Sequence, residues 1–564
     1  MRVVGESPPA TATDDLEAAL QQLHQRRGAW VRVSLSQRAA LLRACLAGVR
    51  RVAPEWARRV TAAKGIDSVS ELAGEAWLSG PMTTIRCLRT ASDALSSGAR
   101  PAPAAISERD GQIVAHVTPD GMLEKLVLAG ITAEVWIEPG AEPSQGRIYR
   151  HKQGGCFSPG SVALVLGAGN ISAIAPRDLV HKLCVDDEVV VLKMHPLNEY
   201  LGPLFERAFA PLIEGGFLRI VYGGAEVGSY LCGHELVSSI HLTGSHHTHD
   251  AIVWGTGKGE CKRRKAAGTP ANDKRVTSEL GCVSPVIVVP GEWSDAELEF
   301  QARSVAGMMT HNASFNCTAA KALVVHDRWR QRERFVERLS EILAKTPQRN
   351  AYYPGAADRY QRFCAEYPEA RPLGPPAPDG RVPWTIIRDV RPRRDEHALR
   401  TEAFCGILAE VGVAASDAGD FLERAATVAN DEIWGNLSCN VIIDPRTERA
   451  LATQLNATVA GLRYGGVAVN TWSSVLFGLS TASWGAFPGN PLDDVQSGIG
   501  TVGNALLFDH PQKSVARAPF KQWPIPPWLP DHRTLRNFGR LWTDFEARPS
   551  WSKLPRVALT AVRA

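Results

Sequence analysis

The chain has 564 residues, of which 44% are hydrophobic and 22% are charged, and its formal net charge is +4. This is the composition of a globular protein, and its length allows two or more domains with large cores. The small net charge gives no general case for nucleic acid or an anionic membrane as a partner. Eleven cysteines, from Cys45 to Cys439, form no CxxC pair, which indicates reduced thiols and not a disulfide framework.

The N-terminal residues MRVVGESPPATATDD lack the apolar core of a signal peptide. No apolar run has the length that a bilayer requires. We therefore expect a cytoplasmic protein without a membrane partner.

The first 160 residues predict helices followed by short strands. Residues 1–14 are rich in Pro, Ala and Thr and are expected to be disordered. Residues 15–63 place leucines at helical spacing, and residues 64–100 continue as helix. The segments expected to form strands after the linker 101–108 are 112–117, 133–137 and 146–149, in a small β element that projects from a larger body.

From Ser161 onward, apolar strands alternate with helical stretches. The expected strands are 162–166, 189–193, 218–222 and 239–245. Strands without a polar face suit a parallel sheet that is covered on both sides, with ligands beyond the carboxyl ends of the strands. The residues that fall at those ends are Asn170, Lys193, Gly223, Gly224, Thr243, Gly244 and Ser245.

The second half of the chain repeats this α/β alternation. Residues 255–276 are rich in Gly, Lys and Arg and are expected to form an exposed loop. Further strands are expected at 285–289, 322–326, 406–412, 439–443 and 467–470, and a helix at 296–309. The tail begins with a possible strand at 504–509 and then becomes rich in Pro and Trp.

Cys317 stands between a polar turn and an apolar run, in the sequence HNASFNCTAAKALVV from His311 to Val325. A loop on a rigid scaffold is a common place for a nucleophile. A buried, unreactive thiol is the commoner fate of a lone cysteine, so other motifs must decide between the two.

The ordered set of motifs resembles the aldehyde dehydrogenase superfamily over about residues 15–500. The motifs are Asn170, Lys193, Thr243-Gly244-Ser245, Glu279-Leu280-Gly281, Cys317 and Glu402-Ala403-Phe404. The resemblance implies two doubly wound, Rossmann-like parallel-sheet domains and a small β oligomerisation arm. The implied division is a dinucleotide-binding domain at 15–128 and 161–280, an arm at 129–160 and about 503–518, a catalytic domain at 281–471, a return at 472–502 and a C-terminal extension at 519–564.

The resemblance also implies roles for the motif residues. Cys317 would attack the aldehyde carbon, Asn170 would hold the oxyanion, and Glu279 would activate the water that hydrolyses the thioester. The implied cofactor contacts are Lys193, Gly224, Thr243, Gly244, Ser245, Glu402 and Phe404. An aldehyde would be oxidised to a carboxylate by a homodimer or homotetramer.

The expected cofactor is NAD or NADP. A glutamate stands three residues after the lysine in many members, and this chain has Pro196 there. A missing carboxylate removes repulsion against a 2′-phosphate, and Glu199 stands close enough in sequence to replace it, so the choice stays open.

Two alternatives to aldehyde oxidation remain. One is a CoA-acylating or phosphorylating enzyme on the same scaffold, which would not need Glu279, and the other is a non-catalytic dinucleotide-binding protein.

The aromatic residues that suggest an apolar pocket are Trp293, Phe315, Trp472, Phe477 and Trp484. The histidines in the sequence HHTH from His246 to His249 lack companion ligands, and no metal site is expected.

Overall fold

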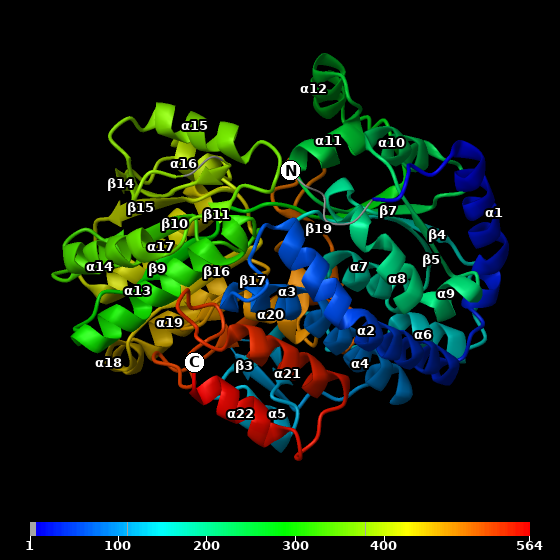
Figure 1. Cartoon of the computed structure of the whole chain (residues 1–564), viewed down its shortest axis with the longest axis horizontal. Coiled ribbons are helices and arrows are strands. Elements are labelled where there is room, and N and C mark those ends of the chain that lie inside the picture. The colour runs from blue at the N-terminus through cyan, green and yellow to red at the C-terminus, as the bar shows by residue number, and fades with distance from the viewer. Residues whose placement is uncertain (1–6, 110, 378–379) are drawn as a thin grey trace.

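Two large β-sheets organise the computed structural model, which describes residues 7–109, 111–377 and 380–564 (Figure 1). Helices flank both sheets, and the candidate site residues line one cavity. The predicted α/β fold is confirmed. No described helix is both long and apolar enough to cross a membrane.

The first sheet has six strands in the order β19-β8-β7-β4-β5-β6. Strands β4 to β8 are parallel, and β19 runs antiparallel to β8. Strands β4, β5 and β7 are buried along their whole length, as their continuous apolar sequences predicted. The bounds are β4 (Val162–Leu166), β5 (Val189–Lys193), β6 (Leu218–Val221), β7 (Ser239–Thr243), β8 (Arg275–Glu279) and β19 (Gly498–Ile499).

The second sheet has eleven strands in the order β1-β2-β3-β21-β17-β16-β9-β10-β15-β14-β12. Its centre is parallel, from β21 to β14, and its two ends are antiparallel. The bounds are β1 (Ala105–Arg109), β2 (Gln112–Thr118), β3 (Thr132–Ile137), β9 (Pro285–Val288), β10 (Ala322–His326), β12 (Arg371–Leu373), β14 (Trp384–Val390), β15 (Ile407–Val413), β16 (Ser438–Ile442), β17 (Gly466–Val469) and β21 (Pro511–Arg517).

The strands that were expected to form an arm lie at one end of this eleven-stranded sheet. Strand β3 pairs with β21, and β21 pairs in parallel with β17. Within the chain, these strands therefore continue the sheet that carries β9 and β10.

Helices cover both sheets and link them. Those that bear on the site are α2 (Leu35–Ala63), α3 (Gly74–Trp77), α4 (Thr83–Ser96), α5 (Met122–Val127), α7 (Ile174–Cys184), α10 (Ala225–Gly233), α11 (His246–Trp254) and α13 (Asp295–Thr310). The others near the sheets include α1 (Thr13–Trp30), α8 (Gly202–Ala208), α14 (Arg332–Lys345), α15 (Ala356–Glu366), α17 (Ala418–Thr427), α19 (Ala452–Gly461) and α20 (Ser474–Leu479).

The C-terminal extension forms two further helices, α21 (Leu535–Ala547) and α22 (Leu554–Val562). Figure 1 shows them, in red, beside α2 and α5. The Glu546 carboxylate, on α21, pairs with Arg86 at 2.8 Å and with Arg89 at 2.6 Å, both on α4. These ion pairs, of which Arg86 and Glu546 are buried, fix the extension to the N-terminal helices.

Several local predictions were wrong. Residues 255–276 are not a loop, because α12 (Lys258–Ala267) and the start of β8 lie there. Their high polarity suggested a loop, but Arg264 pairs with Glu260 one helical turn away at 2.8 Å. Residues 146–149 begin a helix, α6 (Arg147–Gln153), and not a strand.

The two ends of the chain also differ from the prediction. In the segment 1–14, residues 1–6 lie outside the described residues. The backbone N–H of Thr11 donates a hydrogen bond to the Tyr222 carbonyl at 3.1 Å, and α1 begins at Thr13. The expected strand at 504–509 is absent, because Asn504 and Leu507 have positive φ, and the strand begins at Pro511.

Candidate active site

Cys317 and Glu279 meet where the two sheets meet. Glu279 is the last residue of β8, and Cys317 precedes β10. The Cys317 thiol donates a hydrogen bond to Glu279 Oε1 at 3.2 Å. Two groups that are 38 residues apart in sequence thus form a thiol–carboxylate pair, which is the arrangement of a nucleophile beside its base.

Burial sets the protonation of this pair. Burial, and next the nearby Asp178 carboxylate, raise the pKa of Glu279 to about 7. Burial and the Glu279 carboxylate raise the pKa of the Cys317 thiol well above its usual range. Glu279 Oε2 has no hydrogen-bond partner among the described residues. Glu279 can therefore gain or lose a proton near neutral pH, as a general base must.

A left-handed loop presents Cys317. Asn312, Ala313 and Ser314 have φ values of 55°, 56° and 68°, a conformation that costs roughly 1–2 kcal/mol for each residue with a Cβ. Asn312 Oδ1 accepts hydrogen bonds from Lys64 Nζ at 2.6 Å and from the Tyr352 hydroxyl at 2.9 Å. Contacts from distant parts of the chain therefore hold the loop in this shape.

A buried ion pair supports the same loop. Glu75 Oε2 accepts a hydrogen bond from the Asn312 backbone N–H at 3.3 Å and pairs with Arg349 at 2.9 Å. Arg349 lowers the pKa of Glu75 to about 2, against the opposing effect of burial. Burial lowers the pKa of Lys64 to about 7. Sequence reasoning missed Lys64, Glu75 and Arg349, because no local pattern links them to Cys317.

Asn170 lies against the same loop. Its side-chain Nδ2 donates a hydrogen bond to the Phe315 carbonyl at 3.0 Å, two residues before Cys317. Its backbone carbonyl accepts from Lys64 Nζ and Tyr352 at 3.2 Å each. A side-chain amide has two N–H donors, so one is left for a ligand oxygen.

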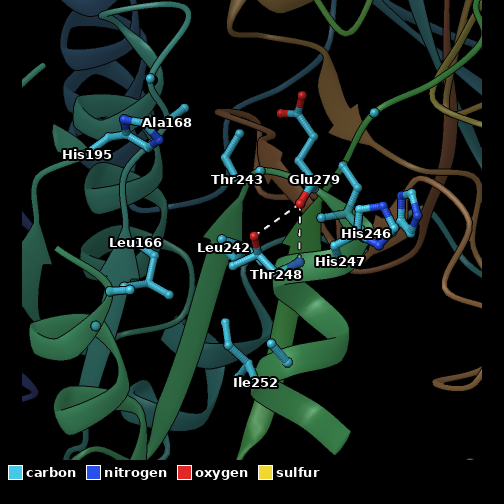
Figure 2. Close-up of a pocket in the computed structure, with 18 of the residues that line it drawn as sticks. Leu166, Ala168, His195, Leu242, Thr243, His246, His247, Thr248, Ile252 and Glu279 are labelled. Atoms are coloured by element: carbon cyan, nitrogen blue, oxygen red, sulfur yellow. Dashed lines mark hydrogen bonds between the residues drawn. The ribbon is translucent and has the colours of Figure 1, made fainter. Parts of the chain in front are cut away.

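All ten residues predicted for the site line one cavity of about 1310 Å³. Figure 2 shows part of it, with His195, Thr243 and Glu279 around the space. The lining residues from the prediction are Asn170, Lys193, Gly224, Thr243, Gly244, Ser245, Glu279, Cys317, Glu402 and Phe404. We call this space the large cavity.

Two helix N-termini meet the large cavity. Gly224 and Ser245 are the N-cap residues of α10 and α11. The Ser245 hydroxyl accepts a hydrogen bond from the Thr248 backbone N–H at 3.2 Å, which is one of the dashed lines near Thr248 in Figure 2. A Cβ at Gly224 or Gly228 would meet nothing within 4 Å. Helix N-termini favour phosphate groups, and the volume exceeds that of an ordinary drug-sized site. These residues fit a dinucleotide.

Neither Pro196 nor Glu199 brings a carboxylate to the Lys193 end of the large cavity. Pro196 lines it, whereas the Glu199 carboxylate accepts from Gly223 N at 2.7 Å and is not among the lining residues. The His195 ring lies against Gly169, where a Cβ would come within 2.6 Å of it. Burial and Lys193 lower the pKa of His195 to about 4, so this ring is neutral at pH 7.

Glu402 and Phe404 lie at the Cys317 end of the large cavity. Glu402 Oε1 pairs with Lys321 Nζ at 3.2 Å. A Cβ at Gly281 would stand 1.8 Å from Glu402 Oε2, so only glycine fits there. Phe404 packs on Phe315 with ring centroids 5.6 Å apart. Lys321 is a residue that the sequence reasoning did not assign.

A second cavity, of about 510 Å³, reaches Cys317 and Glu279 from the other side. We call it the apolar channel. Trp472, Phe477 and Trp484 line it, as predicted. Trp293 does not, because it packs in a core cluster with Trp329 and Phe520. Phe315 packs on two tyrosines instead.

The C-terminal extension supplies much of the wall of the apolar channel. Its lining residues include Trp523, Ile525, Trp528, Phe538, Trp542 and Val557. Sequence reasoning left this segment without a role, although its content of Trp and Pro was visible. In the part of the chain that the structure describes, no cluster of three or more His, Cys, Asp or Glu could hold a metal ion.

Comparisons with known proteins agree with this geometry. The model of the aldehyde dehydrogenase family matches residues 185–357. The betaine aldehyde dehydrogenase of Brucella anthropi is 33% identical over 136 residues, which are 24% of this chain and 23% of that protein. The D-glyceraldehyde dehydrogenase (NADP(+)) of Thermoplasma acidophilum is 32% identical over 142 residues, 25% of each chain. The match thus spans about a quarter of the length of these curated relatives.

Solved structures share the fold over most of the chain. The NAD-dependent aldehyde dehydrogenase from Sinorhizobium meliloti has a TM-score of 0.61 at 19% identity, covering 90% of this chain and 88% of that one. Lactaldehyde dehydrogenase from Escherichia coli has a TM-score of 0.60 at 18% identity, covering 92% and 95%. On the family match, the shared fold and the motif residues around one cavity, the chain belongs to the aldehyde dehydrogenase superfamily.

Proposed function

We propose that this protein oxidises an aldehyde to a carboxylate with NAD or NADP as the acceptor. The observation that carries the proposal is the hydrogen bond from Cys317 Sγ to Glu279 Oε1, at the point where the large cavity and the apolar channel meet. A nucleophile there can reach a substrate from one side and a dinucleotide from the other.

In the first half of the reaction, the Glu279 carboxylate takes the thiol proton and Cys317 Sγ attacks the aldehyde carbon. The carbonyl oxygen becomes an oxyanion, which the free N–H of Asn170 is placed to stabilise. Removing one such donor costs roughly 3–4 kcal/mol in comparable sites. A dinucleotide held by Lys193, Ser245 and Glu402 in the large cavity would supply the acceptor for the hydride of the thiohemiacetal carbon.

In the second half, the Cys317 thioester is hydrolysed. Glu279 first releases the thiol proton to solvent and then takes a proton from water. The hydroxide attacks the acyl carbon, the C–S bond breaks, and the Cys317 thiolate takes the proton back from Glu279 as the acid product leaves and ionises in solvent. The pKa of Glu279, raised to about 7, suits both proton transfers near neutral pH.

For the cofactor, we propose that NADP is accepted as well as NAD. Pro196 and the bond between Glu199 and Gly223 support this, because Pro196 carries no carboxylate and the Glu199 carboxylate is bonded to a backbone N–H and does not line the large cavity. The D-glyceraldehyde dehydrogenase of Thermoplasma acidophilum is named for NADP, which agrees with the proposal.

We also keep the predicted division into domains and a homo-oligomer as proposals. The six-stranded sheet supports a dinucleotide-binding unit within the predicted segments 15–128 and 161–280, although β1 and β2 of the first segment pair in the eleven-stranded sheet. The eleven-stranded sheet supports a catalytic unit at 281–471. Its edge strand β1 has one paired side, and such an edge can pair with another chain. Light scattering of the purified protein tests the oligomeric state.

A stoichiometric reaction tests the function. Enzyme, NADP or NAD and a reactive aldehyde should give a burst of about one NAD(P)H per site, and Cys317→Ala should give none. If no aldehyde gives a burst, the non-catalytic alternative stands. If turnover requires CoA or phosphate and Glu279→Gln is harmless, the acyl-transferring alternative stands.

A further inference from the structure

We propose that the apolar channel binds the unreactive part of a long, apolar aldehyde, and that the C-terminal extension is the wall that selects it. This substrate class rests on the proposed function, because the reacting group must lie at Cys317. The channel, its wall and its opening are separate observations, and each points to the same class.

The wall of the apolar channel is mostly hydrophobic, and Arg86 and Glu279 are the Arg, Lys, Asp or Glu residues among those that line it. Its lining includes Trp472 and Trp484 from the body of the fold and Ile525, Trp528 and Val557 from the extension. Its volume of about 510 Å³ lies within the range of sites that bury a drug-sized ligand. A site of this chemistry gains binding free energy from buried apolar area and offers little to a sugar or an amino acid.

The charged group that lines the channel away from Cys317 and Glu279 is already neutralised. Arg86 pairs with Glu546 at 2.8 Å and with Glu124, and its Nε donates to the Leu479 carbonyl at 2.8 Å. The Arg86 side chain is 5% exposed. An acidic tail on the substrate would therefore find no cation to bind it.

The extension is held as a fixed part of the fold. A Cβ at Gly74 would come within 2.3 Å of the Leu535 carbonyl oxygen, and a Cβ at Gly539 within 2.9 Å of Trp77, so α21 lies directly against α3. Trp528 Nε1 donates to Ser304 Oγ at 3.3 Å on α13. The wall is thus in place before any substrate enters.

The channel opens among exposed apolar side chains. Leu126, Trp523 and Val562 line it and are 54%, 69% and 46% exposed. They come from α5, the Pro-rich segment and α22, which lie together in Figure 1. A rim of this kind favours the entry of an apolar chain, because burying these side chains against it releases water from both surfaces.

This reasoning gives a quantitative expectation. Each methylene group buried in the channel should raise kcat/KM by about fourfold, from roughly 0.8 kcal/mol per CH₂. For unbranched aldehydes, kcat/KM should therefore climb steeply from two carbons upward and level off when the channel is full.

The test compares two adjacent, exposed positions on α22, of which one lines the channel and the other does not. Ala558→Trp places a large ring in the lining, and Leu559→Trp places the same ring on an adjacent residue that is 52% exposed and not in the lining. We expect Ala558→Trp to lower the ratio of kcat/KM for dodecanal to that for propanal at least tenfold, and Leu559→Trp to leave the ratio unchanged.

A binding measurement separates this inference from the proposed function. Unreactive 1-alkanols, added without cofactor, should change the fluorescence of the channel tryptophans, with affinity that rises with chain length and falls in Ala558→Trp. Alkanol binding without oxidation of any aldehyde would support the channel and overturn the oxidation. Oxidation with a flat dependence on chain length, or equal ratios in the two variants, would overturn the channel and leave the oxidation standing.

Discussion

Glu279→Gln tests the electrostatics of the candidate site in two independent ways. The glutamine keeps the shape of the side chain and removes the charge. Glu279 is 3% exposed and lies beside Cys317 and Asp178. The substitution should therefore change both the free energy of unfolding and the rate of thioester hydrolysis, each with its own dependence on pH.

The stability effect follows from the difference in pKa between the folded and unfolded chains. Folding raises the pKa of this carboxyl from 4.5 to about 7. Below pH 4.5 both states hold the proton and the wild type has no penalty. As the pH rises towards 7 the unfolded carboxyl ionises first, so the stability of the wild type falls. Above pH 7 the full penalty is about 3 kcal/mol, which Glu279→Gln removes.

Thermal unfolding at pH 5.5 and pH 8 measures this effect at matched heating rates. Relative to the wild type, Glu279→Gln should gain about 2 kcal/mol more at pH 8 than at pH 5.5. The control is Glu423→Gln, on an exposed side chain of α17, which should show no such gain. Equal stability of wild type and Glu279→Gln at both pH values would refute the assignment of a buried, destabilised carboxyl.

The kinetic effect has the opposite sign. Loss of the base should lower steady-state turnover by roughly 10²- to 10⁴-fold, while a burst of NAD(P)H should persist at high pH, where the thiol ionises unaided. In the wild type, turnover should rise with pH through about 7 as Glu279 loses its proton. A full steady-state rate in Glu279→Gln would show that another group activates water.

Three further substitutions test the loop and the cofactor site. Glu75→Gln leaves Arg349 buried without its partner and should lower the free energy of unfolding by about 3–5 kcal/mol. Because folding lowers the pKa of Glu75 to about 2, the ion pair stabilises the wild type above pH 4.5 and this stability is lost as the pH falls towards 2. Chemical denaturation at pH 7 measures the effect, and an unchanged free energy of unfolding would contradict the role of the ion pair. Ala313→Gly relieves a residue with a φ of 56° and should stabilise the fold by about 0.5 kcal/mol after the entropic cost of glycine, and a lower thermal midpoint would contradict this. Pro196→Glu restores a carboxylate three residues after Lys193 and should lower kcat/KM with NADP relative to NAD about tenfold, whereas an unchanged ratio would place the adenosine ribose elsewhere.

The sequence alone predicted the α/β architecture, and its resemblance to a known family supplied the ordered set of candidate site residues. Continuous apolar strands such as 162–166 and 189–193 have no polar face, and only a sheet covered on both sides can bury them. Asn170, Lys193 and Ser245 follow or end strands of this kind, so the parallel arrangement brings them to one edge, whereas Cys317 and Glu402 precede their strands. Local patterns were sufficient for the strands, because burial on both faces shows in residues that are neighbours along the chain.

Only the tertiary structure decided what surrounds Cys317. Lys64, Glu75 and Arg349 reach its loop from segments far apart in sequence, and the tail beyond residue 519 becomes the wall of the apolar channel. Periodicity reports which face of an element is buried, but it does not report which distant element buries it. The same limit applies to Glu199. Its place in the sequence suggested a contact with the cofactor, but in the structure its carboxylate accepts a hydrogen bond from the Gly223 backbone N–H.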